Sequence, residues 1–164
     1  MTKEALVILY LHGWQSVPGG VKPSHLRQQG AQVFEPALPA EDFPQSVRIA
    51  EAARREQLPD LIVGSSRGGA VALDMDSGDL PLVLLAPAWR RWGSASRVKP
   101  ECRILHAEAD DVIAFADSLQ LLTQSGLPEG QLIRTGSEHR LADPDSLQRL
   151  WQAVEEVMGR SRAV

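Results

Sequence analysis

A serine stands inside a glycine-rich segment, GSSRG at residues 64–68, and this pattern is typical of a catalytic nucleophile. Apolar runs flank the segment, so we expect a strand to lead into it and a helix to leave it. In so sharp a turn, a side chain two residues before or after the nucleophile would collide with the backbone, and Gly64 and Gly68 carry none. Ser65 lacks such flanking glycines, so Ser66 is the predicted nucleophile. Glycine-rich turns also bind phosphates, but the strings that do so, G-x-G-x-x-G and the P-loop, are absent from this sequence.

A serine hydroxyl becomes reactive when a histidine takes its proton, and that histidine needs a carboxylate to hold its tautomer. His139 lies in a loop after the last apolar run and is the only histidine that follows the candidate acids. Those acids, Glu108, Asp110 and Asp111, follow the apolar run before it. The order of serine, acid and histidine, each after a different strand, is a known order for a catalytic triad. The residue types alone leave the choice among the three acids open.

Three further histidines compete for the role of base. His25 falls in an expected helix, and His106 lies within an expected strand, where a histidine is commonly a buried, hydrogen-bonded core residue. His12 precedes a glycine at the end of the first strand, and we expect it to order a loop by hydrogen bonding. His139 is therefore the predicted base.

A tetrahedral intermediate also needs two hydrogen-bond donors for its oxyanion. One is expected from the backbone N–H of Arg67, the residue after the nucleophile. The second is expected from the loop after the first strand, where Gly13 lets the backbone turn inward and Trp14 supplies an N–H. The Trp14 side chain could equally be that of a core tryptophan. Both roles are compatible, because the donor is the main-chain N–H.

The elements that must position these groups alternate along the chain. Short apolar runs predict strands at 5–11, 32–35, 60–64, 81–86, 103–107 and 131–135. Amphipathic stretches predict helices at 22–29, 43–56, 67–74, 114–125 and 145–158, with Gly30 and Gly126 as C-terminal caps. Such alternation predicts an α/β fold: a three-layer sandwich with a mostly parallel sheet of about six strands. No composition break or long linker divides the sequence, so residues 1–164 are expected to form one domain.

Composition narrows the function classes. The chain has 164 residues and a formal net charge of −4, which argues against a protein built to bind nucleic acid through a basic face. The apolar stretch at 5–11 is too short for a signal peptide core or a membrane span, so we expect a cytoplasmic protein that does not bind membranes. A single cysteine, Cys102, is expected to be a buried small hydrophobe, and the predicted triad chemistry needs no metal or cofactor.

Together these motifs resemble the α/β-hydrolase superfamily, and more narrowly its short bacterial esterases of the YqiA type, which have no cap domain. The resemblance rests on YLHGW at 10–14, the GSSRGG turn, ADDVI at 109–113 and the SEH string at 137–139. It implies that Asp110 is the acid. Two residues depart from the usual pattern, Ala107 in place of a glycine and Arg67 in place of an uncharged residue. The Arg67 guanidinium could bind an anionic substrate group or pair with a surface carboxylate.

The expected reaction is acyl transfer to Ser66, followed by hydrolysis of the acyl-enzyme. Only a short loop, 87–100, stands where a cap would enter, so the site should be open to small or medium soluble carboxylic esters. Trp89 and Trp92 are candidate walls of the site, and surface packing would account for these side chains equally well. One alternative is a non-catalytic interaction protein that retains the fold. Another is the same triad acting as a thioesterase, peptidase or acyltransferase. The oligomeric state is left open by the sequence.

Overall fold

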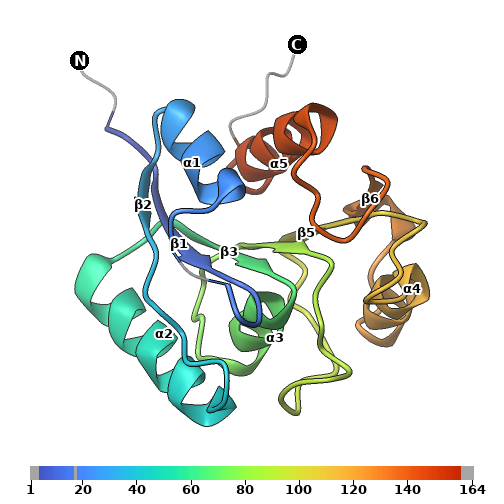
Figure 1. Ribbon diagram of the computed structural model, residues 1–164, viewed down its shortest axis with the longest axis horizontal. Coiled ribbons are helices and arrows are strands. Elements are labelled where there is room, and N and C mark those ends of the chain that lie inside the picture. The colour runs from blue at the N-terminus through green and yellow to red at the C-terminus, as the bar shows by residue number, and fades with distance from the viewer. Residues whose placement is uncertain (1–3, 17, 160–164) are drawn as a thin grey trace.

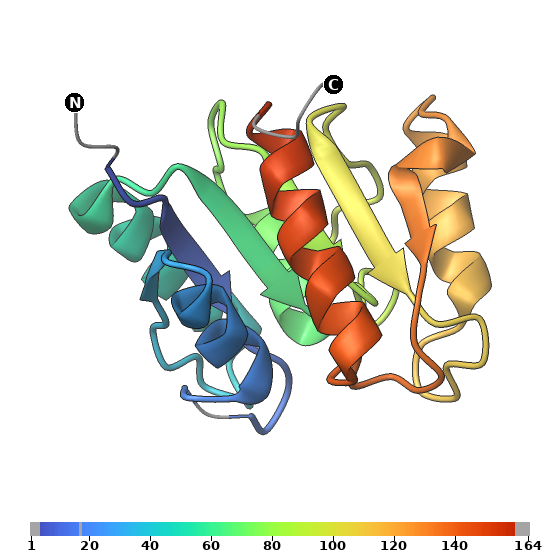
Figure 2. The same ribbon diagram turned by 90° about the horizontal axis from the view of Figure 1, so that it is seen from above.

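A six-stranded sheet runs through the protein, and the computed structural model describes residues 4–16 and 18–159 around it. All neighbouring strands are parallel, in the order β2-β1-β3-β4-β5-β6. Figure 2 shows the strand arrows all running in one direction. The strands are β1 Val7–Leu11, β2 Gln32–Phe34, β3 Leu61–Ser65, β4 Leu82–Leu85, β5 Cys102–His106 and β6 Leu132–Arg134.

Helices cover both faces of this sheet (Figures 1 and 2). One face packs against α1 and α5, and the other against α2, α3 and α4, so the molecule has two separate apolar cores. Side chains alternate between these cores along each strand, which is why the strands are apolar at nearly every position. The helices are α1 Val21–Gln28, α2 Phe43–Gln57, α3 Arg67–Asp74, α4 Phe115–Gln124 and α5 Pro144–Val157, with a 3₁₀ turn at Glu129–Gln131.

The predicted fold class is confirmed, since each predicted strand and helix is present within one or two residues of its expected bounds. The helix ends carry the expected caps. Gly30 and Gly126 have positive φ angles of 101° and 71° and follow the C-cap residues of α1 and α4. Asp42 and Asp143 accept hydrogen bonds from the first turns of α2 and α5, and both of these helices have a proline in that turn.

The direction of strand addition reverses between β1 and β3, because β2 lies on one side of β1 and β3 on the other. Loops diverge at such a point, and open α/β sheets bind ligands there, at the carboxyl ends of the strands. Leu11 at the end of β1 lies in register with Gly64 of β3, so the loops that follow these strands begin side by side. The sheet thus places the predicted nucleophile and the predicted oxyanion loop at one edge.

The connection from β4 to β5, residues 86–101, contains neither a helix nor a strand. The fold therefore carries no cap domain between β4 and β5. Within the described parts of the chain, no helix is long and apolar enough to span a lipid bilayer.

Candidate active site

Ser66 occupies the strained turn between β3 and α3. Its φ of 56° and ψ of −117° lie in a region that non-glycine residues rarely adopt. Two backbone contacts with the neighbouring strand and loop hold it there: its N–H donates to the Leu85 carbonyl at 2.8 Å, and its carbonyl accepts from Ala88 at 3.0 Å. The same carbonyl also accepts the N–H of Gly69 in the first turn of α3 at 2.9 Å. The strain is thus maintained by bonds to β4 and the loop beyond it.

The two flanking glycines are required by close backbone contacts. A Cβ on Gly64 would lie 2.6 Å from the Gly68 carbonyl oxygen. A Cβ on Gly68 would overlap the Leu11 carbonyl oxygen at the end of β1. The opposing atoms are backbone and cannot move aside as a flexible side chain could. This confirms the steric argument that singled out the glycine pattern around Ser66.

Three side chains from distant parts of the sequence meet at this turn. His139 Nε2 lies 3.0 Å from Ser66 Oγ, and His139 Nδ1 lies 2.7 Å from Asp110 Oδ2. Because an ionised carboxylate only accepts hydrogen bonds, Nδ1 carries the proton and Nε2 is free to accept the serine hydroxyl. The geometry is that of a nucleophile, a base and an orienting acid within hydrogen-bond reach.

Asp110, rather than Glu108 or Asp111, is the acid that reaches His139. Its other oxygen, Oδ1, accepts the N–H groups of Val112 and Ile113, each at 2.8 Å. Burial raises the pKa of Asp110, but the hydrogen bonds from His139, Ile113 and Val112 outweigh it and hold the pKa below its usual range. Asp110 is therefore ionised at neutral pH despite being buried.

His106, at the end of β5, also contacts the carboxylate of Asp110. Its Nε2 lies 3.1 Å from Asp110 Oδ2 and 2.9 Å from the Ile113 carbonyl oxygen, and both of these atoms accept. Nε2 therefore carries a proton, and Nδ1, 2.7 Å from Ser118 Oγ, accepts the serine hydroxyl. Burial lowers the pKa of His106, so the ring is neutral. The prediction of a buried, hydrogen-bonded histidine is confirmed, but the residue pattern did not indicate that one of its partners would be the acid.

The remaining histidines do not approach Ser66 as bases. His12 is buried, and its Nδ1 donates to the Gly13 carbonyl at 2.9 Å while its Nε2 accepts the Leu38 N–H at 3.0 Å. It orders the loop after β1, as expected. His25 lies on α1, as expected from its place in a helical stretch.

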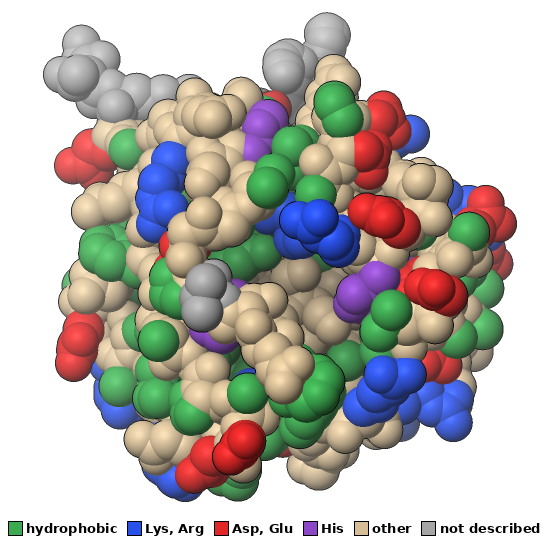
Figure 3. Space-filling model, viewed as in Figure 1, with side chains coloured by type: hydrophobic (Ala, Val, Ile, Leu, Met, Phe, Trp, Pro, Cys, Tyr) green, Lys and Arg blue, Asp and Glu red, His purple; other side chains and the backbone are tan. Residues whose placement is uncertain are grey.

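A cavity of about 460 Å³ opens beside the triad, lined by Ser66 and His139 and by the loop after β1. Two of its lining residues, Trp14 and Val112, are apolar and are 53% and 43% exposed. Two others are basic: Lys22 from α1 and Arg140 next to the base. Figure 3 shows basic side chains and a histidine around a hollow on this face of the molecule.

The two predicted oxyanion donors both lie near the nucleophile: Arg67 follows it in sequence, and Trp14 belongs to the loop after the neighbouring strand β1. Arg67 begins α3 directly after Ser66, so its N–H is one of those that a helix leaves unpaired at its start. Gly13 approaches closely, since a Cβ placed on it would lie 3.5 Å from Ser66 Cβ. Trp14 follows and lines the cavity. The donor roles of these two N–H groups remain predictions.

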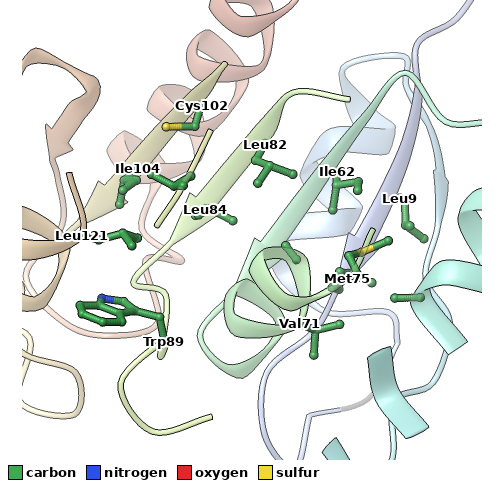
Figure 4. Packing of buried hydrophobic residues seen from close by; sticks show 14 of the residues in the cluster. Leu9, Ile62, Val71, Met75, Leu82, Leu84, Trp89, Cys102, Ile104 and Leu121 are labelled. Carbon is green, nitrogen blue, oxygen red and sulfur yellow. The ribbon is translucent and has the colours of Figure 1, made fainter. Parts of the chain in front are cut away.

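Trp89 does not form a wall of the site, and this expectation was wrong. Its side chain is only 8% exposed and belongs to the core under β4 and β5, and its indole N–H donates to the Asp117 carbonyl at 2.9 Å. Figure 4 shows the ring among core residues near Leu121. The loop after β4 turns this tryptophan inward against α4, a path that the local sequence does not reveal.

The Arg67 side chain performs neither of the roles considered for it. It is almost fully buried, with Nη1 donating to Ser46 Oγ at 3.2 Å and Nη2 donating to the Pro39 carbonyl at 2.9 Å. The guanidinium also stacks on Phe43 and on Trp92, at 5.3 and 4.7 Å from the ring centroids. It joins α2 to the start of α3 and does not line the cavity. Trp92 therefore packs over the Arg67 guanidinium, and its ring centroid lies 6.3 Å from that of Trp14.

Sequence reasoning missed the basic residues that line the cavity. Lys22 and Arg140 are 118 positions apart, and only the packing of α1 beside the His139 loop brings them together. Arg140 directly follows the predicted base, and that adjacency was the one available signal.

Comparisons of the fold with solved structures give many matches. The chain superposes on alpha/beta hydrolase domain-containing protein 10 from mouse with a TM-score of 0.73 and 14% identity, covering 98% of this chain and 92% of that one. Est1E from Butyrivibrio proteoclasticus matches with a TM-score of 0.69 and 15% identity, over 96% and 88% of the two chains. The ydeN gene product of B. subtilis matches with a TM-score of 0.70 and 13% identity, over 94% and 100%.

The sequence matches no protein-family model and no curated protein. At identities this low, the superpositions establish the architecture alone. The described residues have the α/β-hydrolase fold in a minimal form, without a cap domain among them.

Proposed function

We propose that the protein is a serine hydrolase that cleaves small to medium carboxylic esters through an acyl-enzyme on Ser66. One observation carries the proposal: His139 lies within hydrogen-bond distance of Ser66 Oγ through one ring nitrogen and of Asp110 through the other, at 3.0 and 2.7 Å. The hydrolase fold of the structural neighbours agrees with this reaction class.

The reaction begins with attack of Ser66 Oγ on the ester carbonyl carbon while His139 Nε2 takes the hydroxyl proton. Asp110 stabilises the imidazolium that forms, since its carboxylate stays ionised and fixed by two backbone N–H groups. The oxyanion accepts hydrogen bonds from the N–H groups of Arg67 and Trp14. His139 then gives its proton to the leaving alcohol oxygen, and the C–O bond breaks.

Water completes the cycle. His139 takes a proton from a water molecule that attacks the acyl carbon, and the second tetrahedral intermediate collapses to release the acid and restore the Ser66 hydroxyl. None of these steps draws on a redox or metal-bound group. The same steps would also cleave a thioester or an amide, or transfer the acyl group to an acceptor other than water. Which bond is cleaved and which acceptor is used therefore depend on the molecules that bind in the cavity.

The cavity favours acyl groups of modest size. Its volume is about 460 Å³, and no cap formed by the described residues covers it. Trp14 and Val112 are exposed apolar residues of its lining and can cover a short hydrocarbon segment. Long lipid chains would extend beyond this surface into solvent, which makes them poorer substrates.

Hydrolysis of a panel of p-nitrophenyl esters and matched thioesters, with acyl chains of two to sixteen carbons, tests this function. We expect turnover that is highest for short and medium chains, with release of nitrophenol faster in the first turnover than in later ones if deacylation is slow. Ser66→Ala should reduce kcat by about 10⁴-fold or more. A folded wild-type protein that hydrolyses none of the panel would favour the non-catalytic interaction protein instead.

A further inference from the structure

Two cationic residues line the active-site cavity from elements far apart in the sequence. Lys22 lies in the first turn of α1, and Arg140 directly follows His139. The Lys22 ammonium donates to the backbone carbonyl of Arg140 at 2.5 Å. Both residues line the same cavity as Ser66 and His139. The fold thus brings two cationic residues together beside the nucleophile.

Neither Lys22 nor Arg140 forms an ion pair with a carboxylate of the described residues. The ion pairs present there are formed by other arginines. The acid on the adjoining β2–α2 connection, Glu35, is engaged by Arg27 at 3.5 Å and by the Gly19 N–H at 2.8 Å. Burial, and to a lesser degree the charge of Arg140, lowers the pKa of Lys22 to about 8. The folded protein therefore keeps a half-buried ammonium in an environment that disfavours its charge.

A purely structural role does not account for this arrangement. Tethering the Arg140 carbonyl to α1 needs one hydrogen-bond donor, and an uncharged donor would supply it without repulsion between two cations. A half-buried cation that opens onto a reaction cavity is instead suited to pair with a charged ligand. A carboxylate or phosphate oxygen placed between Lys22 and Arg140 would supply the missing counter-charge.

We propose that Lys22 and Arg140 bind an anionic group of the substrate, so that the ester hydrolysed at Ser66 carries a carboxylate or a phosphate. The inference rests on the proposed hydrolase function and specifies its substrate class. The cavity then has two binding regions beside the nucleophile: an apolar one at Trp14 and Val112, and an anion-binding one at Lys22 and Arg140.

Two substrates of nearly equal length test the inference: the p-nitrophenyl monoester of glutaric acid, which is anionic, and p-nitrophenyl pentanoate, which is neutral. We expect wild-type kcat/KM to be about tenfold higher for the anionic ester, because a hydrogen-bonded charge pair contributes that much. The ratio of the two kcat/KM values should fall about tenfold in Lys22→Met and in Arg140→Gln. Lys22→Arg should retain part of the preference for the anionic ester, and added salt should reduce the wild-type ratio.

Matched controls separate a local effect from a change in net charge or folding. Arg149→Gln removes one exposed positive charge on α5, a residue that does not line the cavity, and should leave the ratio as in wild type. Arg140 is exposed, so its variant should fold even if a change at half-buried Lys22 does not. Inhibition of pentanoate hydrolysis by free glutarate and by inorganic phosphate distinguishes the two kinds of anionic group, and the more potent inhibitor identifies the better fit.

The outcomes distinguish this inference from the function on which it rests. Hydrolysis of the neutral ester with no preference for the anionic one, or a ratio that Lys22→Met and Arg140→Gln leave unchanged, overturns the anion site and leaves the hydrolase standing. Failure of a folded wild-type protein to hydrolyse either ester overturns both.

Discussion

His106 and His139 share one carboxylate oxygen, since both approach Oδ2 of Asp110, at 3.1 and 2.7 Å. His139 is partly exposed to the cavity, whereas His106 is fully buried beneath it. The acid is thus held from four directions, by two backbone N–H groups on one oxygen and by two imidazoles on the other. We regard His106 as a positioning residue that acts through Asp110.

Replacement of His106 should lower turnover without weakening substrate binding. His106→Leu removes the donor to Asp110, so we expect kcat to fall by about 10- to 100-fold with KM nearly constant, as for other residues that orient a functional group. His106→Gln can place an N–H near the position of Nε2 and should recover part of kcat. Steady-state kinetics on one short ester, with melting temperatures as a check on folding, would measure this. Equal kcat in wild type and His106→Leu would show that the contact is only structural.

Gly68, beside Ser66, and Gly130, in the 3₁₀ turn before β6, should differ sharply in their tolerance of a methyl group. Gly68→Ala forces a Cβ against the Leu11 carbonyl, so we expect the free energy of unfolding to fall by at least about 3 kcal/mol or the protein not to fold. Gly130→Ala is the matched control, because a Cβ there meets nothing within 4 Å. It should change stability by less than about 1 kcal/mol. Urea unfolding of both variants measures the difference, and similar values would contradict the packing of the turn.

Lys22 should reduce stability in a pH-dependent way. Its pKa is about 8 in the folded protein and 10.5 ordinarily, so below pH 8 the lysine is charged in both states and the folded state bears the full cost. Between pH 8 and 10.5 the folded lysine loses its proton first, and the cost disappears. At pH 7, the free energy of unfolding of Lys22→Met should therefore exceed that of the wild type by roughly 1–3 kcal/mol, as measured by denaturant unfolding. This difference should become smaller as the pH rises toward 10.5. A stability difference independent of pH would contradict this assignment.

Most of the fold and the triad could be predicted because their signals are local. Val and Leu on both faces of short runs marked the strands, and Gly64 and Gly68 marked the turn at Ser66 through a steric requirement that depends only on neighbours in sequence. His139 followed from its place after the last strand. The choice of Asp110 over its neighbours needed a resemblance, since three acids within four positions are equivalent by type.

The walls of the cavity could not be predicted in this way. Trp89 and Trp14 each follow a strand, yet one turns into the core against α4 and the other stays half exposed at the cavity. Arg67 drew attention as a charge beside the nucleophile, but Phe43 and Trp92 enclose it. Such outcomes depend on how loops pack against helices that are distant in sequence, and residue type alone does not determine them.

Covalent labelling of Ser66 tests the central claim most directly. A fluorophosphonate reacts with a serine only when an adjacent base activates it, so intact-protein mass spectrometry reports the working triad without knowledge of the substrate. We predict one adduct per wild-type chain, located by peptide mapping at Ser66, none on folded Ser66→Ala, and much slower labelling of His139→Ala. A folded wild-type protein that stays unlabelled, or a Ser66→Ala variant labelled to the same extent, would contradict the assignment of Ser66 as the nucleophile.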